Sequence, residues 1–160
     1  MAFHISDTHF NHENIIKYCN RPFKSVEEMN EYIIEQWNRV VGVNDVVYHH
    51  GDFALGISTH DCIDILKRLN GQKVLICGNL DVRSDTWYKN CGFNRVVRKQ
   101  ETIKDKYLLT HVPRDIEDIP RGIINIHGHV QDRSVDKFNK PDYDVNGTCD
   151  VLDYTPIWVE

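Results

Sequence analysis

The sequence predicts an α/β protein, because short apolar runs of strand length alternate with two amphipathic helical patterns. Hydrophobic residues make up 41% of the 160 residues and charged residues 27%, as in ordinary soluble globular proteins. A chain of this length suits one domain, residues 1–160, with a core in two or three layers. The sequence has no repeat, low-complexity stretch or linker that would divide it.

Strands are predicted where a short apolar run leads into turn or polar residues. The main predicted strands span residues 2–6, 45–49, 73–77, 107–109 and 123–126. Two further strands, at 149–152 and 157–159, are expected to close a second sheet. The turn residues Pro141, Gly147 and Pro156 argue against a helix in this last part of the chain.

Two helices are predicted from the helical spacing of apolar residues. The first begins at Ser25, with Glu28 three residues on as its capping-box partner. Its buried face is expected to comprise Val26, Met29, Ile33, Trp37 and Val40. The second spans about 59–69, with Gly71 just after its end. Its inward residues are expected to be Ile63, Leu66 and Leu69.

Charge and cysteine content exclude several classes of protein. A net charge of −5 gives no overall basic footprint of the kind that holds long nucleic acid. The five cysteines are scattered and odd in number, which argues against a disulfide framework and against a thiolate zinc site. The N-terminus lacks the features of a signal peptide, and no window reaches the length of a membrane span. We therefore expect a cytoplasmic protein with reduced thiols and no membrane partner.

Metal-binding residue types follow five of the predicted strands. They are Asp7-x-His9, Gly51-Asp52, Gly78-Asn79, His111 and Gly128-His129-x-Gln131. Ligands of open α/β sheets bind at the carboxyl ends of the strands, so these side chains are expected to converge there. Asp7 and His9, two apart on an extended strand, are expected to point to one side. Carboxylate, imidazole and amide oxygen without thiolate favour Mn²⁺, Fe²⁺, Ni²⁺, Co²⁺ or Zn²⁺.

The order of these motifs resembles the signature of calcineurin-like phosphoesterases, which reads Asp-x-His, Gly-Asp, Gly-Asn-His-Asp, a lone His and Gly-His-x-His. The corresponding segments here are Asp7-Thr8-His9, Gly51-Asp52, Gly78-Asn79-Leu80-Asp81, His111 and Gly128-His129-Val130-Gln131. Five motifs in order, from residue 7 to residue 131, are far more specific than any one of them. The flanking residues are similar to those of small bacterial and phage members. The resemblance implies a two-sheet αββα sandwich of the metallophosphoesterase type.

The resemblance also implies two divalent metal ions. One would be bound by Asp7, His9 and the last histidine position, which is Gln131 here. The other would be bound by Asn79, His111 and His129, and Asp52 would bridge the two. Such a pair of ions makes a bridging hydroxide near neutral pH and clamps the phosphoryl oxygens during in-line attack.

Two site residues depart from the family pattern. Gln131 offers an amide in place of imidazole, which predicts a weak metal on that side. His127 could substitute for it only through a change of strand register. Leu80 stands where the family has the histidine thought to protonate the leaving group. His12 and His50 are the candidates to replace that general acid, the alternative being that each is an ordinary structural or solvent-facing histidine.

Two arginines lie near these motifs and are candidate substrate contacts. Arg83 follows the Asn79 motif and Arg114 follows His111, and guanidinium groups suit bidentate binding of phosphate. His12 is a third candidate contact, and the alternative for both arginines is simple solvent exposure. Asp81 is expected to orient a neighbouring group rather than bind metal.

The sequence therefore predicts a metal-dependent phosphoesterase. With no inserted domain to hold an extended substrate, a small phosphodiester or a cyclic nucleotide is favoured over a phosphomonoester. The rival is a non-hydrolytic protein that binds a nucleotide or a partner through a partly degenerate site, a hypothesis kept open by Leu80 and Gln131.

Overall fold

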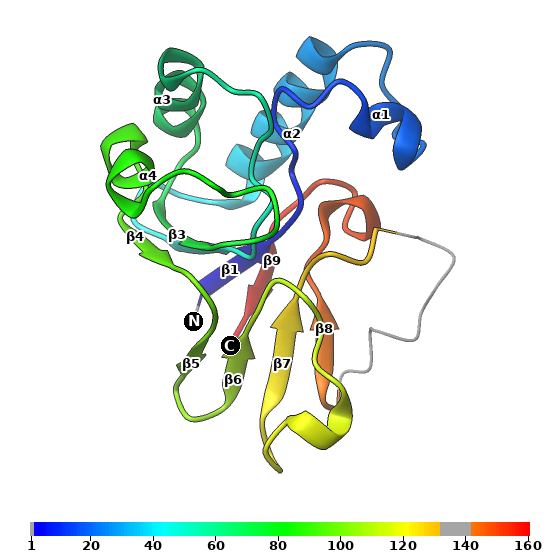
Figure 1. The fold of residues 1–160 in the computed structure, drawn as a ribbon, viewed down its shortest axis with the longest axis vertical. Coiled ribbons are helices and arrows are strands. Elements are labelled where there is room, and N and C mark those ends of the chain that lie inside the picture. Colours follow the sequence, from blue (N-terminus) through cyan, green and yellow to red (C-terminus); the bar gives the residue numbers. More distant parts are fainter. Residues whose placement is uncertain (1, 132–141) are drawn as a thin grey trace.

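The computed structural model describes residues 2–131 and 142–160 and contains two β-sheets flanked by helices (Figure 1). The predicted α/β class and the two-sheet sandwich are both confirmed. Four helices gather at the first sheet, and the second sheet extends away from them (Figure 1).

The first sheet has five strands in the order β4-β3-β2-β1-β9. Their bounds are β1 (Ala2–Ile5), β2 (Val46–His49), β3 (Gln72–Ile76), β4 (Arg95–Val97) and β9 (Ile157–Val159). Strands β1 to β4 are parallel, with Phe3 opposite Val47, and β9 runs antiparallel to β1. The carboxyl ends of the four parallel strands therefore meet at one edge of the sheet.

The second sheet has four strands in the order β5-β6-β7-β8. Their bounds are β5 (Glu101–Ile103), β6 (Tyr107–Leu109), β7 (Ile124–His127) and β8 (Asp144–Asn146). Strands β6, β7 and β8 are parallel, and β5 is antiparallel to β6. The carboxyl end of β6 lies beside that of β2, since His111 donates to the His50 carbonyl. The end of β7 joins them, since the Gly128 amide donates to the His111 carbonyl.

The predicted closing strands of the second sheet were wrong in two respects. Residues 157–159 do form a strand, but it pairs with β1 in the first sheet, with Val159 opposite Ala2. Residues 149–152 form the short 3₁₀ helix η2 (Cys149–Val151) instead of a strand. The second sheet is closed by β8, whose alternating Asp144 and Asn146 are buried polar residues, so no apolar run revealed it.

The described residues also form four α-helices and a second 3₁₀ helix. They are α1 (Ile15–Tyr18), α2 (Val26–Val40), α3 (Thr59–Arg68), α4 (Asp85–Cys91) and η1 (Ile116–Asp118). The predicted start of α2 is confirmed, since the Ser25 hydroxyl accepts from the Glu28 amide at 3.1 Å. The Lys24 amide donates to the Glu28 carboxylate at 2.9 Å. A capping box would use the amide of Ser25, one residue later. None of the helices in 2–131 and 142–160 has the length and apolar character needed to cross a bilayer.

Strand alternation divides the core into two layers. Leu75 and Val47 face the helices, where they pack with Ile33 and Trp37 of α2. The neighbouring Ile76 faces the opposite way and packs with residues of the second sheet, such as Leu109 and Ile126.

In α2 the expected face is buried at Met29, Ile33 and Trp37 and only partly buried at its two ends. Both layers hold the loops at the carboxyl edge in fixed positions.

Candidate metal centre

The loops that follow the strands bring two groups of metal-binding side chains together. The first group is Asp7, His9 and Asp52, and the second is Asp52, His111 and His129. Within each group, one ligand atom from every residue lies within 4.8 Å of the others. Because both groups contain Asp52, they form one continuous cluster of carboxylates and imidazoles at the carboxyl edge of the sheets.

The first group is completed by Gln131. His9 Nε2 lies 3.7 Å from Asp7 Oδ1 and 3.9 Å from Asp52 Oδ2. The Gln131 amide nitrogen lies 3.0 Å from Asp7 Oδ1 and 3.0 Å from His9 Nε2. Its amide oxygen accepts a hydrogen bond from the Cys19 thiol at 2.6 Å. Gln131 therefore faces the site with its nitrogen, and coordination would require a half-turn of the amide.

The second group has two imidazoles, and a backbone hydrogen bond fixes the orientation of His111. His111 Nδ1 donates to the His50 carbonyl at 2.7 Å, which leaves Nε2 as the atom that faces Asp52 at 3.4 Å. The same Nε2 lies 3.2 Å from His129 Nδ1. Burial alone would lower the pKa of His111, but the carboxylates of Asp52 and Asp7 raise it to about 9. The cluster thus attracts positive charge strongly, which fits a site for divalent cations.

Asp52 is held by hydrogen bonds at both its carboxylate and its backbone amide. Its Oδ1 accepts from the Leu80 amide at 2.9 Å, while its Oδ2 faces His9 and His111. The Asp52 amide donates to the Asp81 carboxylate at 2.6 Å, and the Gly78 amide donates to the same carboxylate at 2.7 Å. Asp81 therefore joins the loops after β2 and β3, as expected of a residue that orients its neighbours.

The backbone conformation of the site differs from the sequence expectation. Strand β1 ends at Ile5, and Asp7 and His9 have φ values of 59° and 52°. Asp52 and His129 also lie in the left-handed region, with φ of 54° and 72°. Non-glycine residues adopt this region at a cost of about 1–3 kcal/mol, and such residues cluster at functional sites. The side chains converge through strained turns, so the extended alternation predicted for Asp7 and His9 was wrong.

Glycines let these loops approach one another closely. A Cβ on Gly128 would collide with the Ser6 hydroxyl and with Asp7 Oδ2, although Gly128 itself does not have positive φ. Gly51 combines a φ of 105° with a backbone contact, since a Cβ there would lie 2.5 Å from the Gly78 nitrogen. Only glycine fits at position 128 because there is no room for a Cβ. At position 51 glycine is needed both for lack of room and for its positive φ.

His50 is directed away from the cluster, so its candidacy as the general acid is not supported. The strand β2 ends at His49, and the turn at Gly51 separates the directions of His50 and Asp52. The buried His50 ring lies 2.9 Å from His4 Nδ1 and 3.0 Å from the Thr110 carbonyl, and burial lowers its pKa to about 4. His50 joins the two sheets instead.

His12 lies beside the cluster. Its Nδ1 is 2.9 Å from His9 Nδ1, and its amide donates to the His9 carbonyl at 3.0 Å. Burial and then the neighbouring His9 lower the pKa of His12. His12 thus remains the nearer of the two candidate proton donors. His127 is fully buried with its Nδ1 at 3.0 Å from the Gly128 carbonyl, so it does not replace Gln131.

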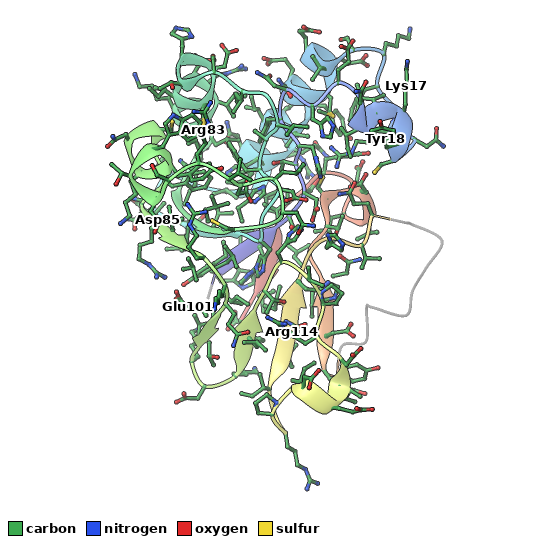
Figure 2. The ribbon with its side chains drawn as sticks, viewed as in Figure 1. Lys17, Tyr18, Arg83, Asp85, Glu101 and Arg114 are labelled. Atoms are coloured by element: carbon green, nitrogen blue, oxygen red, sulfur yellow. The ribbon has the colours of Figure 1, made fainter. Side chains whose placement is uncertain are left out.

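The remaining predicted residues lie at or outside the margin of the cluster. Asn79 is exposed and lies in the loop after β3, between Gly78 and Leu80, whose amides donate to Asp81 and Asp52. Arg83 lies beside α3 and α4, with its guanidinium 4.9 Å from the Trp87 ring (Figure 2). Arg114 lies on the second sheet and donates to Gln100 at 3.0 Å (Figure 2). No described contact joins Arg114 to the ligand residues, so its role as a substrate contact stays a prediction.

Sequence reasoning missed Arg21, whose side chain hydrogen-bonds to the backbone of the loop that carries Asp7. Its guanidinium donates to the carbonyls of Asp7 at 2.6 Å and Thr8 at 2.9 Å and forms a buried ion pair with Asp150 at 2.9 Å. An arginine followed by Pro22 is typical of an exposed turn, and its partner lies 129 residues further on. No local pattern could have indicated this role.

A cluster of carboxylates and imidazoles at the carboxyl edge of a two-sheet sandwich is the arrangement of a metal-dependent phosphoesterase. Comparison with known families agrees, because the family described as calcineurin-like phosphoesterase matches residues 2–158. The chain belongs to this family.

Two of the similar proteins are described as uncharacterised or of unknown function. An uncharacterized protein of Methanocaldococcus jannaschii is 38% identical over 157 residues, which cover 96% of this chain and 84% of that protein. A protein of unknown function from Aquifex aeolicus has a similar solved structure, with a TM-score of 0.78 and 29% identity over 98% of this chain and 94% of its own. The nuclease MPE of Pseudomonas putida shares the fold, with a TM-score of 0.55 and 19% identity over 79% of this chain and 60% of its own.

Proposed function

We propose that this phosphoesterase hydrolyses a small phosphodiester, with cyclic nucleotides among the candidates, at a centre that binds two divalent cations. The observation that carries the proposal is the pair of three-residue groups that share Asp52. Cations held there would activate water and neutralise charge on the phosphoryl oxygens. Mn²⁺, Fe²⁺, Ni²⁺, Co²⁺ and Zn²⁺ all suit these donors.

The residues would have unequal roles in binding the cations. Asp52 would contact both, since its Oδ2 faces His9 on one side and His111 on the other. Asp7, His9 and Gln131 would form the first site, and His111 with His129 would form the second, which Asn79 would complete. Asp7 can accept a cation because its pKa is far below the ordinary carboxyl value. Burial opposes ionisation, but the interaction with the nearby His9 imidazole, the charge of His111 and a hydrogen bond from Ser6 outweigh it.

Leu80 restricts the choice of leaving group. Its side chain cannot donate a proton, and its amide is already bound to Asp52. The rate should therefore favour leaving groups of low pKa, unless His12 supplies the proton. We place the activity in the cytoplasm, on a small soluble phosphate ester or nucleotide and not on long nucleic acid or a membrane.

A direct test is hydrolysis of bis(p-nitrophenyl) phosphate by protein loaded with Mn²⁺. Turnover that EDTA removes and Mn²⁺ restores would support the proposal. Two bound Mn²⁺ without turnover of this activated diester or of p-nitrophenyl phosphate would contradict it.

The second candidate is a non-hydrolytic nucleotide-binding or partner-binding protein. The observation that favours it is the contact of the Gln131 amide oxygen with Cys19, which keeps that oxygen away from the first site. One bound Mn²⁺ at saturation, nucleotide binding and no turnover would support this candidate over the enzyme.

A further inference from the structure

A pocket of about 370 Å³ lies beside the metal centre, between the loop after β2 and the loop after β3. We call it the apolar pocket. Its volume falls within the range of small-molecule sites, roughly 300–1,000 Å³. Its floor is formed by Phe53, Cys62 and Tyr88, which are almost completely buried. The floor is therefore a rigid part of the helix-side core.

The apolar pocket and the metal centre share two segments of chain. Phe53 lines the pocket and directly follows Asp52. Leu80 also lines the pocket, and its amide donates to Asp52 Oδ1 at 2.9 Å. A group bound in this pocket would thus lie next to the carboxylate that the two halves of the metal centre have in common.

The walls of the pocket expose apolar side chains to solvent. Val82 is 80% exposed and Leu55 is 39% exposed, and both line the pocket. Exposed apolar groups gathered at a concave surface next to polar chemistry are typical of a binding site. Leu80, at the position of the motif histidine, adds to the same apolar surface.

One edge of the pocket carries a flat aromatic ring and a cation. Trp87 Nε1 donates to the Thr59 hydroxyl at 3.1 Å, which fixes the indole, and the Arg83 guanidinium lies 4.9 Å from the ring centre. Arg83 makes no ion pair within residues 2–131 and 142–160. Its donors are available to a ligand with polar atoms at the rim of an aromatic ring.

We propose that the apolar pocket binds the nucleobase of a nucleotide ester whose phosphoryl group lies at the metal centre. The proposal rests on the proposed function for the position of the phosphoryl group. The apolar walls accommodate the faces of the base, and Arg83, which lies over the Trp87 ring, and Ser58 offer hydrogen bonds to its polar edge. An alkyl chain would leave these polar groups unused, and a second phosphate would meet mainly apolar walls.

The test compares binding of two compounds that cannot be hydrolysed. They are the 5′-phosphonate analogues of adenosine 5′-monophosphate and of ribose 5-phosphate, in which carbon replaces the ester oxygen. Binding to the Mn²⁺-loaded protein is measured by calorimetry. We expect the adenosine compound to bind about tenfold or more tightly than the ribose compound, the range expected for stacking of one base.

In Val82→Asp the affinities for the adenosine and ribose compounds should lie within about threefold of each other. The reason is that the substitution places a carboxylate on the exposed wall of the pocket. The control is Val43→Asp, at a residue that is 72% exposed near the start of β2, at the opposite end of the sheet from the metal centre. This control should keep the preference for adenosine.

Equal affinities of the unmodified protein for the two compounds, or a preference that survives Val82→Asp, would overturn the proposal. A preference that Val82→Asp removes would support it, even if the protein fails to turn over bis(p-nitrophenyl) phosphate. In that case the proposed hydrolysis fails and the nucleobase site stands.

Discussion

The two halves of the candidate metal centre share Asp52 but differ in how their other ligands are held. In the second half, His111 and His129 offer two imidazoles, and a backbone hydrogen bond at 2.7 Å directs His111 Nε2 toward the site. In the first half, Gln131 stands in the place of an imidazole and turns its oxygen to Cys19 at 2.6 Å. The first half would therefore depend on Asp7 and His9 for its affinity for a cation.

This difference indicates that the two cation sites would fill at different concentrations. Imidazole is a stronger ligand than amide oxygen for borderline cations, and an amide oxygen already hydrogen-bonded must first be released. The second site should bind first, and catalysis that needs both ions should depend on the first site.

The largest expected effect is that of Asp52→Asn, which removes the carboxylate shared by both halves. We expect the turnover of bis(p-nitrophenyl) phosphate to fall by about 10³-fold or more, since several kcal/mol of charge stabilisation are lost. The matched variant is His9→Ala, which removes a ligand of the first half only. It should lower turnover less than Asp52→Asn does. If Asp52→Asn stays fully active while His9→Ala is inactive, Asp52 is not a ligand shared by the two halves of the metal centre.

Arg21→Gln should destabilise the protein by roughly 3–5 kcal/mol, because it leaves the buried Asp150 carboxylate without its ion-pair partner. Denaturant unfolding measures this change. Since Arg21 also holds the carbonyls of Asp7 and Thr8, the variant should weaken Mn²⁺ binding at the first site only. Equal weakening at both sites would show that the two halves are not held independently.

Leu80→His should raise the turnover of alkyl phosphodiesters by about 10²-fold and that of aryl phosphodiesters much less. The reason is that a proton donor matters most for a leaving group of high pKa. The unmodified protein should therefore show a steep dependence of rate on leaving-group pKa. A flat dependence would indicate that another group, with His12 as the first choice, already donates the proton, and His12→Ala would then create the steep dependence.

Gln131→His should tighten Mn²⁺ binding at the first site by about tenfold and leave the second site unchanged. Cys19→Ala should have a smaller effect in the same direction, because it removes the hydrogen bond that holds the amide oxygen away from the site. Calorimetric titration of both proteins measures the change. Unchanged or weaker binding in Gln131→His would mean that residue 131 does not contact a cation.

The sequence was sufficient to predict the class of fold and the convergence of Asp7, His9, Asp52, His111 and His129. The reason is that each of these residues follows a strand, and parallel strands end at one edge. Side-chain direction was less predictable. Left-handed turns at Asp7, His9 and Asp52 replace the extended backbone, so His50 and Asp52 diverge although they are two residues apart.

Contacts between residues far apart in the sequence could not be predicted from local sequence patterns. The contacts of Gln131 with Cys19 and of Arg21 with Asp150 join segments separated by more than a hundred residues. The strand β8 alternates Asp144 and Asn146 with Val145 and therefore lacks an apolar run. In each case tertiary contacts, and not a local pattern, decide the outcome.

Unequal cation binding by the two halves is tested most directly by a Mn²⁺ titration in which bound Mn²⁺ and the turnover of bis(p-nitrophenyl) phosphate are both measured at each step. We predict two bound ions of unequal affinity, with turnover that stays low after the first ion and rises as the second, weaker ion binds. Full turnover with a single bound ion, or two bound ions of equal affinity, would contradict this prediction.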